Sequence, residues 1–216
     1  MERFRDLIAN MPIREQAFTS KRETWEKYIS ELPGIEDLIG EIFGHSKSVE
    51  ISRHDLFTFG QGSKVKLFVF ATVLWGYPAG MRGRHFQSIF QNMDHLEKIL
   101  ISNRETNIEN WGEHYRFIDQ VEGLGLSTYT KFLYFIRATI NGLPALILDQ
   151  RLIDVFRKGI FRECRDLKTI SYESAPYLYP KYLKMMDCIA NKYHIDSGKL
   201  EMFLFEFGGN LKLTNS

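Results

Sequence analysis

The sequence predicts an all-α protein built from two lobes that share a cleft. Apolar residues recur at helical intervals along most of its 216 residues, and Gly and Pro residues separate the periodic stretches. Alternating strand and helix patterns, which indicate a parallel sheet, do not occur in the sequence. There is no repeat, low-complexity tract or obvious linker, so we expect a single unit over residues 1–216.

The first half of the chain contains three expected helices and one ambiguous stretch. Ser20 and Glu23 have the spacing of a capping box at the start of the first helix, and Gly44 ends the second. Residues 49–63 have a mixed pattern with room for a short strand. Ser63 then caps a strongly apolar stretch that we expect to be a buried helix. The three helices cover residues 20–32, 35–43 and 64–77.

The second half begins with a Pro/Gly loop over residues 78–85 and continues with amphipathic stretches. An apolar run over 141–149 separates the middle helices from the last three. We expect helices over residues 86–100, 107–121, 126–136, 150–159, 177–194 and 198–208.

Composition excludes several classes of protein. Hydrophobic residues make up 44% and charged residues 25%, as in a soluble globular protein, and a net charge of +1 is too small for a protein that coats DNA. Cys164 and Cys188 are far apart and the six His residues show no paired spacing, so we expect no metal and no cofactor. Without a signal peptide or a membrane-spanning run, we expect a cytoplasmic monomer.

The stretch "VEGLGLSTYTKFLYFI", residues 121–136, places Gly123 and Gly125 between two expected helices. Glycine permits a positive φ and a close approach of the backbone. The first N–H groups of the following helix then face outward at the positive end of its dipole, which suits a phosphate group. A plain connection between helices has the same pattern, with Leu126 and Ser127 as an ordinary cap.

Lys131 lies one turn inside this helix, and Asp149 follows 18 residues later, directly before the next helix. This order resembles the helix-hairpin-helix DNA glycosylase superfamily, and within it the microbial and archaeal 8-oxoguanine DNA glycosylases. The resemblance covers roughly residues 61–212, with the hairpin near 119–136. About 60 N-terminal residues, expected to be a helical segment, carry no match.

The resemblance implies an all-α, two-lobed fold with a DNA-binding cleft, and it implies roles for two residues. Lys131 becomes the amine that attacks the sugar and forms a Schiff base, and Asp149 the carboxylate that stabilises the cation-like sugar. In the usual hairpin the lysine stands where this chain has Ser127, which cannot form a Schiff base. The alternatives are a solvated lysine and an aspartate that only caps its helix.

The C-terminal stretch "LEMFLFEFGGNLK" resembles the closing helix of the same branches. Glu201 then matches the acid that hydrogen-bonds the flipped purine, and Phe205 the aromatic residue that stacks on it. The resemblance gives Phe135 a second stacking role, and Trp75 is a candidate for a third wall. Phe205 also fits an ordinary core stripe, whereas a buried Glu needs a partner.

Arg82, Arg84 and Arg151 are candidates to contact DNA phosphates, although arginines in exposed loops commonly have no such role. The expected partner is double-stranded DNA with a flipped base, in a nucleoid-associated protein. We therefore predict a DNA glycosylase and AP lyase that excises an oxidised purine such as 8-oxoguanine. The alternatives are a catalytically inactive helix-hairpin-helix DNA-binding module, in repair or anti-phage defence, and an all-α protein-binding scaffold.

Overall fold

The computed structural model describes residues 1–211 and is mainly helical, as the sequence predicts. Three short 3-10 helices, η1 (Glu2–Phe4), η2 (Arg162–Leu167) and η3 (Gly208–Asn210), accompany the α-helices. The α-helices within the described residues are α1 (Arg5–Ala9), α2 (Glu23–Glu26), α3 (Ile35–Phe43), α4 (Arg53–Gln61), α5 (Val65–Gly76), α6 (His85–Gln91), α7 (Met93–Asn103), α8 (Trp111–Asp119), α9 (Leu126–Phe135), α10 (Gln150–Lys158), α11 (Ala175–Tyr193) and α12 (Ser197–Phe207).

Two small sheets add to the expected all-α architecture. The strand β1 (Ala17–Lys21) pairs antiparallel with β2 (Ser48–Ser52), which lies in the stretch with the ambiguous pattern. In the second sheet, β3 (Asn107–Ile108) runs parallel to β4 (Thr139–Ile140), and β4 pairs antiparallel with β5 (Leu143–Pro144). The sheets are short, so the helical class holds.

Several expected helices differ from the structure: the one over residues 20–32 is reduced to α2, the one over 86–100 is divided into α6 and α7, and the one over 107–121 becomes β3 followed by α8. Two predicted caps also differ. Ser20 lies in β1 and does not cap a helix: its Oγ accepts a hydrogen bond from Trp25 Nε1 at 2.8 Å and donates one to the Pro78 carbonyl at 3.1 Å. The pairing of β1 with the distant β2 overrides the local capping signal. Lys64, not Ser63, is the N-cap of α5.

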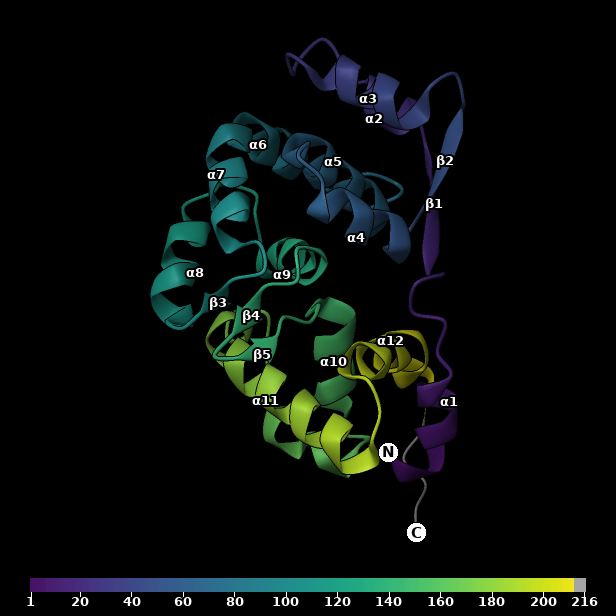
Figure 1. Cartoon of the computed structure of the whole chain (residues 1–216), viewed down its shortest axis with the longest axis vertical. Coiled ribbons are helices and arrows are strands. Elements are labelled where there is room, and N and C mark those ends of the chain that lie inside the picture. The colour runs from purple at the N-terminus through teal and green to yellow at the C-terminus, as the bar shows by residue number, and fades with distance from the viewer. Residues whose placement is uncertain (212–216) are drawn as a thin grey trace.

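The helix α9 is the centre of the structure. Figure 1 shows it end-on, with α4–α7 on one side and α10–α12 on the other, while the β1–β2 ribbon runs along one edge toward α1 and α12. Every residue of α9 except Ser127 is buried. A functional side chain on this helix is therefore held by packing from all directions.

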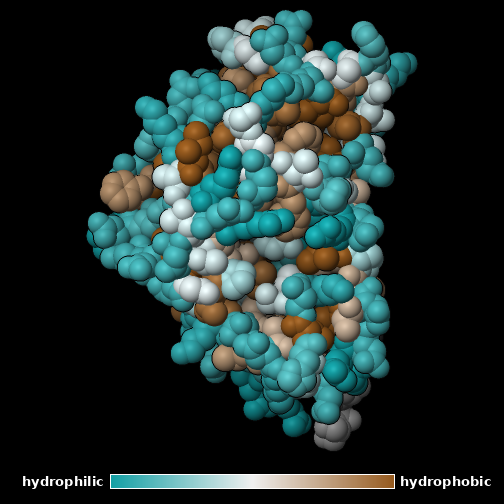
Figure 2. Space-filling view, in the orientation of Figure 1, coloured by the Kyte–Doolittle hydropathy of each residue, from teal (hydrophilic) through white to brown (hydrophobic). Residues whose placement is uncertain are grey.

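The surface in the same orientation is mainly polar, and apolar residues are exposed on it in separate patches (Figure 2). Of the helices in residues 1–211, none combines the length and the apolarity that a membrane span requires. The large apolar side chains that are most exposed lie on different elements: Leu7, Ile101, Phe117, Tyr172, Tyr177 and Phe207.

A polar cluster fixes α8 to α9. His114 Nε2 and Tyr129 Oη form a hydrogen bond, and Asn103 Nδ2 donates to the same hydroxyl at 3.1 Å. Burial lowers the pKa of His114 because the charged imidazolium loses its hydration. The folded protein therefore favours the neutral ring.

This shift predicts a loss of stability in mild acid. The unfolded chain binds a proton at His114 more readily than the folded one, so the contribution of this group is present above pH ~6.5 and is lost as the pH falls through the lower, folded pKa. Thermal unfolding followed between pH ~7.5 and ~5.5 should show a falling Tm, and His114→Gln should flatten that slope. An unchanged slope in the variant would assign the pH dependence to other groups.

Candidate active site

A cavity of about 170 Å³ brings together five of the residues singled out from the sequence. They come from α5, α9, α12 and the residue before α10. The five are Trp75, Lys131, Asp149, Glu201 and Phe205, and the remaining lining residues are Phe18, Arg53, Gly76, Pro78 and Ile147.

Lys131 is the one charged side chain on α9 and is 5% exposed. Its Nζ donates hydrogen bonds to the Ser127 carbonyl at 3.0 Å and to Ser127 Oγ at 2.8 Å, one turn back along the helix. Nζ also lies 5.5 Å from the centre of the Tyr77 ring. Gly76 leaves room for the lysine stem, because a Cβ there would lie 3.1 Å from Lys131 Cδ and Cε. The amine is thus held at the wall of the cavity.

An extended, buried segment over residues 145–148 carries the chain to Asp149. Its polar backbone groups find partners on both sides, which buried peptide groups require. The Tyr179 hydroxyl donates to the Leu146 carbonyl at 2.7 Å, and the Tyr182 hydroxyl donates to the Ile147 carbonyl at 2.8 Å. The Leu148 N–H donates to Thr130 Oγ1 on α9 at 3.2 Å.

Asp149 is the N-cap of α10. Its Oδ1 accepts a hydrogen bond from the Leu152 N–H at 3.1 Å, which fixes the carboxylate at the positive end of the helix dipole. Among the described residues, Oδ2 has no hydrogen-bond donor and is free to act at the cavity. Asp149 therefore combines a structural cap with a carboxylate oxygen available for chemistry.

A buried ion pair closes the cavity. Arg53 is 1% exposed and Glu201 is fully buried. Arg53 Nη1 lies 2.7 Å from Glu201 Oε2, and Nη2 lies 3.3 Å from Oε1. Arg53 Nε also donates to Gln16 Oε1 at 2.6 Å, and Nη1 contacts the Tyr134 hydroxyl at 3.3 Å.

Burial and charge act in opposite directions on this pair. Burial alone lowers the pKa of Arg53, but the charge and hydrogen bonds of Glu201 outweigh it, so the net pKa is raised and the guanidinium stays charged. Burial raises the pKa of Glu201, and the charge of Arg53 opposes that shift. Burial also raises the pKa of Tyr134 to about 12, so its hydroxyl stays protonated beside Arg53.

Aromatic rings form the apolar walls. Phe18 meets Trp75 edge-on at 5.4 Å between ring centres, and Phe205 is half-buried at the rim with Arg151 Cζ 4.6 Å from its ring centre. Phe135 does not line the cavity. It is fully buried and packs edge-on behind Trp75 at 5.4 Å, so it supports the wall and is not placed to stack on a bound base.

The glycine hairpin lies beside the cavity and packs closely. Gly123 has φ +80°, and a Cβ there would lie 2.6 Å from the His85 carbonyl oxygen. A Cβ on Gly125 would collide with the Tyr172 hydroxyl. Gly125, not Ser127, is the N-cap of α9, and no side chain caps that helix. Gly123 is thus required by its φ and by the nearby backbone, whereas at Gly125 the obstacle is the end of the exposed Tyr172 side chain. The first turn of α9 is left open to an outside acceptor.

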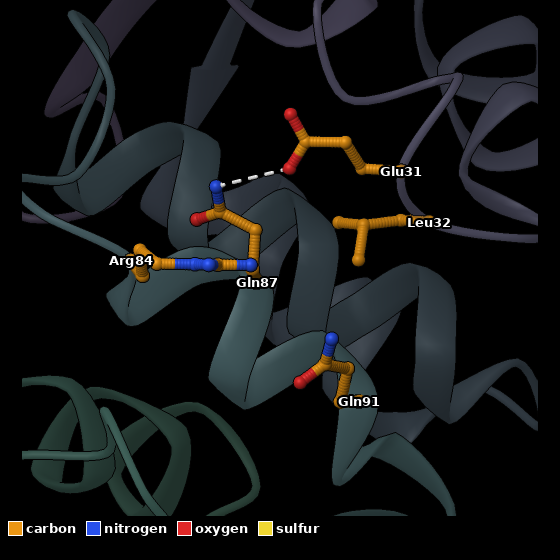
Figure 3. Close-up of a pocket in the computed structure, with 5 residues that line it drawn as sticks. All are labelled: Glu31, Leu32, Arg84, Gln87 and Gln91. Atoms are coloured by element: carbon orange, nitrogen blue, oxygen red, sulfur yellow. Dashed lines mark hydrogen bonds between the residues drawn. The ribbon is translucent and has the colours of Figure 1, made fainter.

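The predicted phosphate contacts fall in different places. Arg82 lines a hollow of about 620 Å³ together with the hairpin and Tyr172. Arg84 lines another hollow, beside Glu31, whose carboxylate accepts a hydrogen bond from Gln87 Nε2 at 3.4 Å (Figure 3). Arg151 does not line the cavity but lies over the ring of Phe205, which does. Of the three arginines, Arg82 shares a hollow with the hairpin and Arg84 does not.

Three site residues come from the N-terminal 60 residues, for which no resemblance was found in the sequence: Gln16, Phe18 and Arg53. The signal available was indirect. Ser52 and Asp55 form a capping box that starts α4 at Arg53. An arginine at a helix start is normally solvated, so nothing in the pattern marks it as buried.

Within residues 1–211, no group of three His, Cys, Asp or Glu side chains is placed to hold a metal ion. The cavity offers the amine of Lys131 and a free carboxylate oxygen of Asp149. The Arg53–Glu201 pair forms its polar end, and aromatic rings form its walls. This combination defines a class of site that suits a planar, polar ring attached to an electrophilic carbon.

Comparison with known protein families shows the family to which the chain belongs. Residues 11–205 match the family described as "Putative 8-oxoguanine DNA glycosylase OGG-like protein", and the chain belongs to this family. The match includes residues 11–60, for which the sequence alone showed no resemblance. No curated protein and no solved structure matches the chain.

The Arg53–Glu201 pair gives a prediction about stability. Arg53→Met leaves a buried, unpaired carboxylate and should cost about 3–5 kcal/mol, whereas Arg53→Met with Glu201→Met should recover most of that loss, because a buried ion pair seldom outperforms apolar side chains of similar size. Urea unfolding of the two single variants and the double variant measures the coupling. A loss in the double variant equal to the sum of the two single losses would mean that the two charges do not depend on each other.

Proposed function

We propose that this protein is a DNA glycosylase with lyase activity that excises an oxidised purine, such as 8-oxoguanine, from duplex DNA. The observation that carries the proposal is the meeting of Lys131 and Asp149 in one small, aromatic-walled cavity. The family to which the chain belongs is described by that activity. A target atom inside a duplex is out of reach, so the nucleotide has to be flipped into the cavity.

The proposed chemistry assigns one step to each group. The Lys131 ammonium first gives its proton to water, and the resulting amine attacks C1′ of the flipped nucleotide. The bond from C1′ to the base breaks, and the base leaves with the electron pair and takes up a proton. The Asp149 carboxylate stabilises the positive charge that develops on the sugar. Opening of the sugar ring gives a Schiff base, from which loss of a C2′ proton expels the 3′-phosphate and nicks the strand.

In this proposal the base is bound by the aromatic walls of the cavity and by the Arg53–Glu201 pair that closes it. The flipped ring stacks between Phe205 and the Trp75 side of the cavity, where Phe18 completes the apolar surface. Glu201 accepts a hydrogen bond from the base with lone pairs that Arg53 does not use. The hairpin N–H groups and Arg82 hold backbone phosphates, and helices α4–α7 and α10–α12 act as two lobes on either side of the DNA.

The two catalytic assignments predict different defects. Lys131→Gln should bind an 8-oxoguanine duplex as well as wild type, yet give no borohydride-trapped adduct and almost no nick. Asp149→Asn retains the amine but should cleave about 10²-fold more slowly or worse and trap weakly. Denaturing gels read both outcomes, and Lys184→Gln, an exposed lysine on α11, is the matched control.

Three results would reassign the site. A trapped adduct in Lys131→Gln means that another amine is the nucleophile. Base loss without a nick in that variant means a monofunctional glycosylase that uses Asp149 and water. A wild type that binds duplex DNA but neither excises nor nicks means a DNA-binding module, and one that does not bind duplex DNA means a protein-binding scaffold.

A further inference from the structure

A further hollow lies at the C-terminal end of α9, between α4 and the start of α12. Its volume is about 740 Å³, which is in the range of sites that hold small organic ligands. It is lined by four basic side chains, Arg14, His54, Arg137 and Lys199. We refer to it as the Arg137 hollow. Tyr134 lines it too, and the hydroxyl of Tyr134 contacts Arg53 of the active-site cavity.

The charge of the Arg137 hollow is unbalanced. Asp196 is the one acidic residue in its lining, and the carboxylate of Asp196 already accepts the Lys199 N–H at 2.9 Å as the N-cap of α12. With His54 neutral, the lining carries a formal charge of +2, from three cations and one carboxylate. The active-site cavity, with two cations and two carboxylates, is neutral. An anion is therefore drawn to this hollow more strongly than to the active site.

The two arginines are available to a ligand. Within residues 1–211, neither Arg14 nor Arg137 forms an ion pair, and both residues are exposed. Arg14 lies next to His54, because the His54 N–H donates to the Arg14 carbonyl at 3.0 Å. Lys199 Nζ donates to the Ala9 carbonyl at 2.6 Å and keeps two further protons.

Arg137 occupies a position that suits glycine. Its φ is +58°, in the left-handed region, and the Ala138 N–H returns to the Leu133 carbonyl at 3.0 Å to close the end of α9. Glycine takes this conformation without strain and is the usual residue there. Arginine is strained in this conformation and glycine is not, so the side chain is what arginine adds at this position.

The rest of the lining suits a ring and its polar edges. Ile13, Phe57 and Leu146 supply apolar surface, and Arg137 Cζ lies 5.8 Å from the centre of the Phe57 ring. The Ser197 hydroxyl adds a donor, whereas the Thr58 hydroxyl already donates to the His54 carbonyl at 3.1 Å and can accept from a ligand. The Nε2 group of Gln61, also in the wall, is buried and has no hydrogen-bond partner within the described residues.

We propose that the Arg137 hollow binds a phosphorylated nucleoside, with the phosphate between Arg14, Arg137 and Lys199 and the base against Phe57. Cations and hydroxyls match the phosphate, and the apolar wall with its unpaired amide matches a heterocycle with polar edges. The nucleotide is either free or the 5′-phosphorylated end of a DNA strand. This site is separate from the active-site cavity and does not rest on the proposed function.

Isothermal titration of the full chain with 2′-deoxyadenosine 5′-monophosphate tests the proposal, with deoxyadenosine and inorganic phosphate as partial probes. The nucleotide should bind at least about tenfold more tightly than either probe, because each probe lacks half of the contacts. Absence of nucleotide binding, or phosphate binding as tight as the nucleotide, would overturn it. A 5′-phosphorylated oligonucleotide that binds more tightly than the mononucleotide assigns the site to a strand end, and the reverse assigns it to a free nucleotide.

Arg137→Gly separates binding from folding. It removes the cation and relieves the left-handed backbone, so the variant should be at least as stable as wild type while nucleotide affinity falls by about tenfold or more. Asn141→Gly is the matched control, since Asn141 has φ +51° and is exposed but carries no charge. Lys131→Gln should leave nucleotide binding intact. Unchanged affinity in Arg137→Gly, or lost affinity in Lys131→Gln, would place the nucleotide elsewhere.

Discussion

The site depends on one interaction, the buried ion pair between Arg53 and Glu201. Two charges taken out of water are tolerated only when they meet each other with good geometry and their remaining groups are hydrogen-bonded. Gln16 and Tyr134 supply those additional bonds to Arg53. The pair joins the start of α4 to α12 across α9, so the N-terminal and C-terminal parts of the chain close one cavity between them.

Around this pair, a helix cap, hydrogen bonds and helix packing hold the reactive groups in position. Asp149 is fixed because it caps α10, and the segment before it is held by the hydroxyls of Tyr179 and Tyr182. Lys131 is fixed because α9 is buried on nearly every side. A lysine amine and a carboxylate oxygen thus reach one space without a loop having to move. The Arg137 hollow lies past Tyr134, which contacts the same Arg53.

The sequence was sufficient for what is decided locally. Helical periodicity predicted most of the helices. The resemblance to the glycosylase superfamily singled out Lys131, Asp149, Glu201 and Phe205, which the fold brings to one cavity. Prediction from the sequence failed where contacts between distant segments determine the structure. The capping signal at Ser20 was overridden by the pairing of β1 with β2, and Phe135, on the expected face of α9, is covered by Trp75. The burial of Arg53 depends on Glu201, 148 residues away, and no local pattern indicates it.

The central claim is that the buried amine of α9 becomes bonded to the sugar. It is tested most directly by mass spectrometry of the borohydride-trapped protein after digestion with trypsin. A modified Lys131 blocks cleavage, so the account predicts a nucleotide adduct on the peptide that covers residues 117–137, with the added mass on Lys131. An adduct found instead on the N-terminal amine or on a surface lysine would contradict the account.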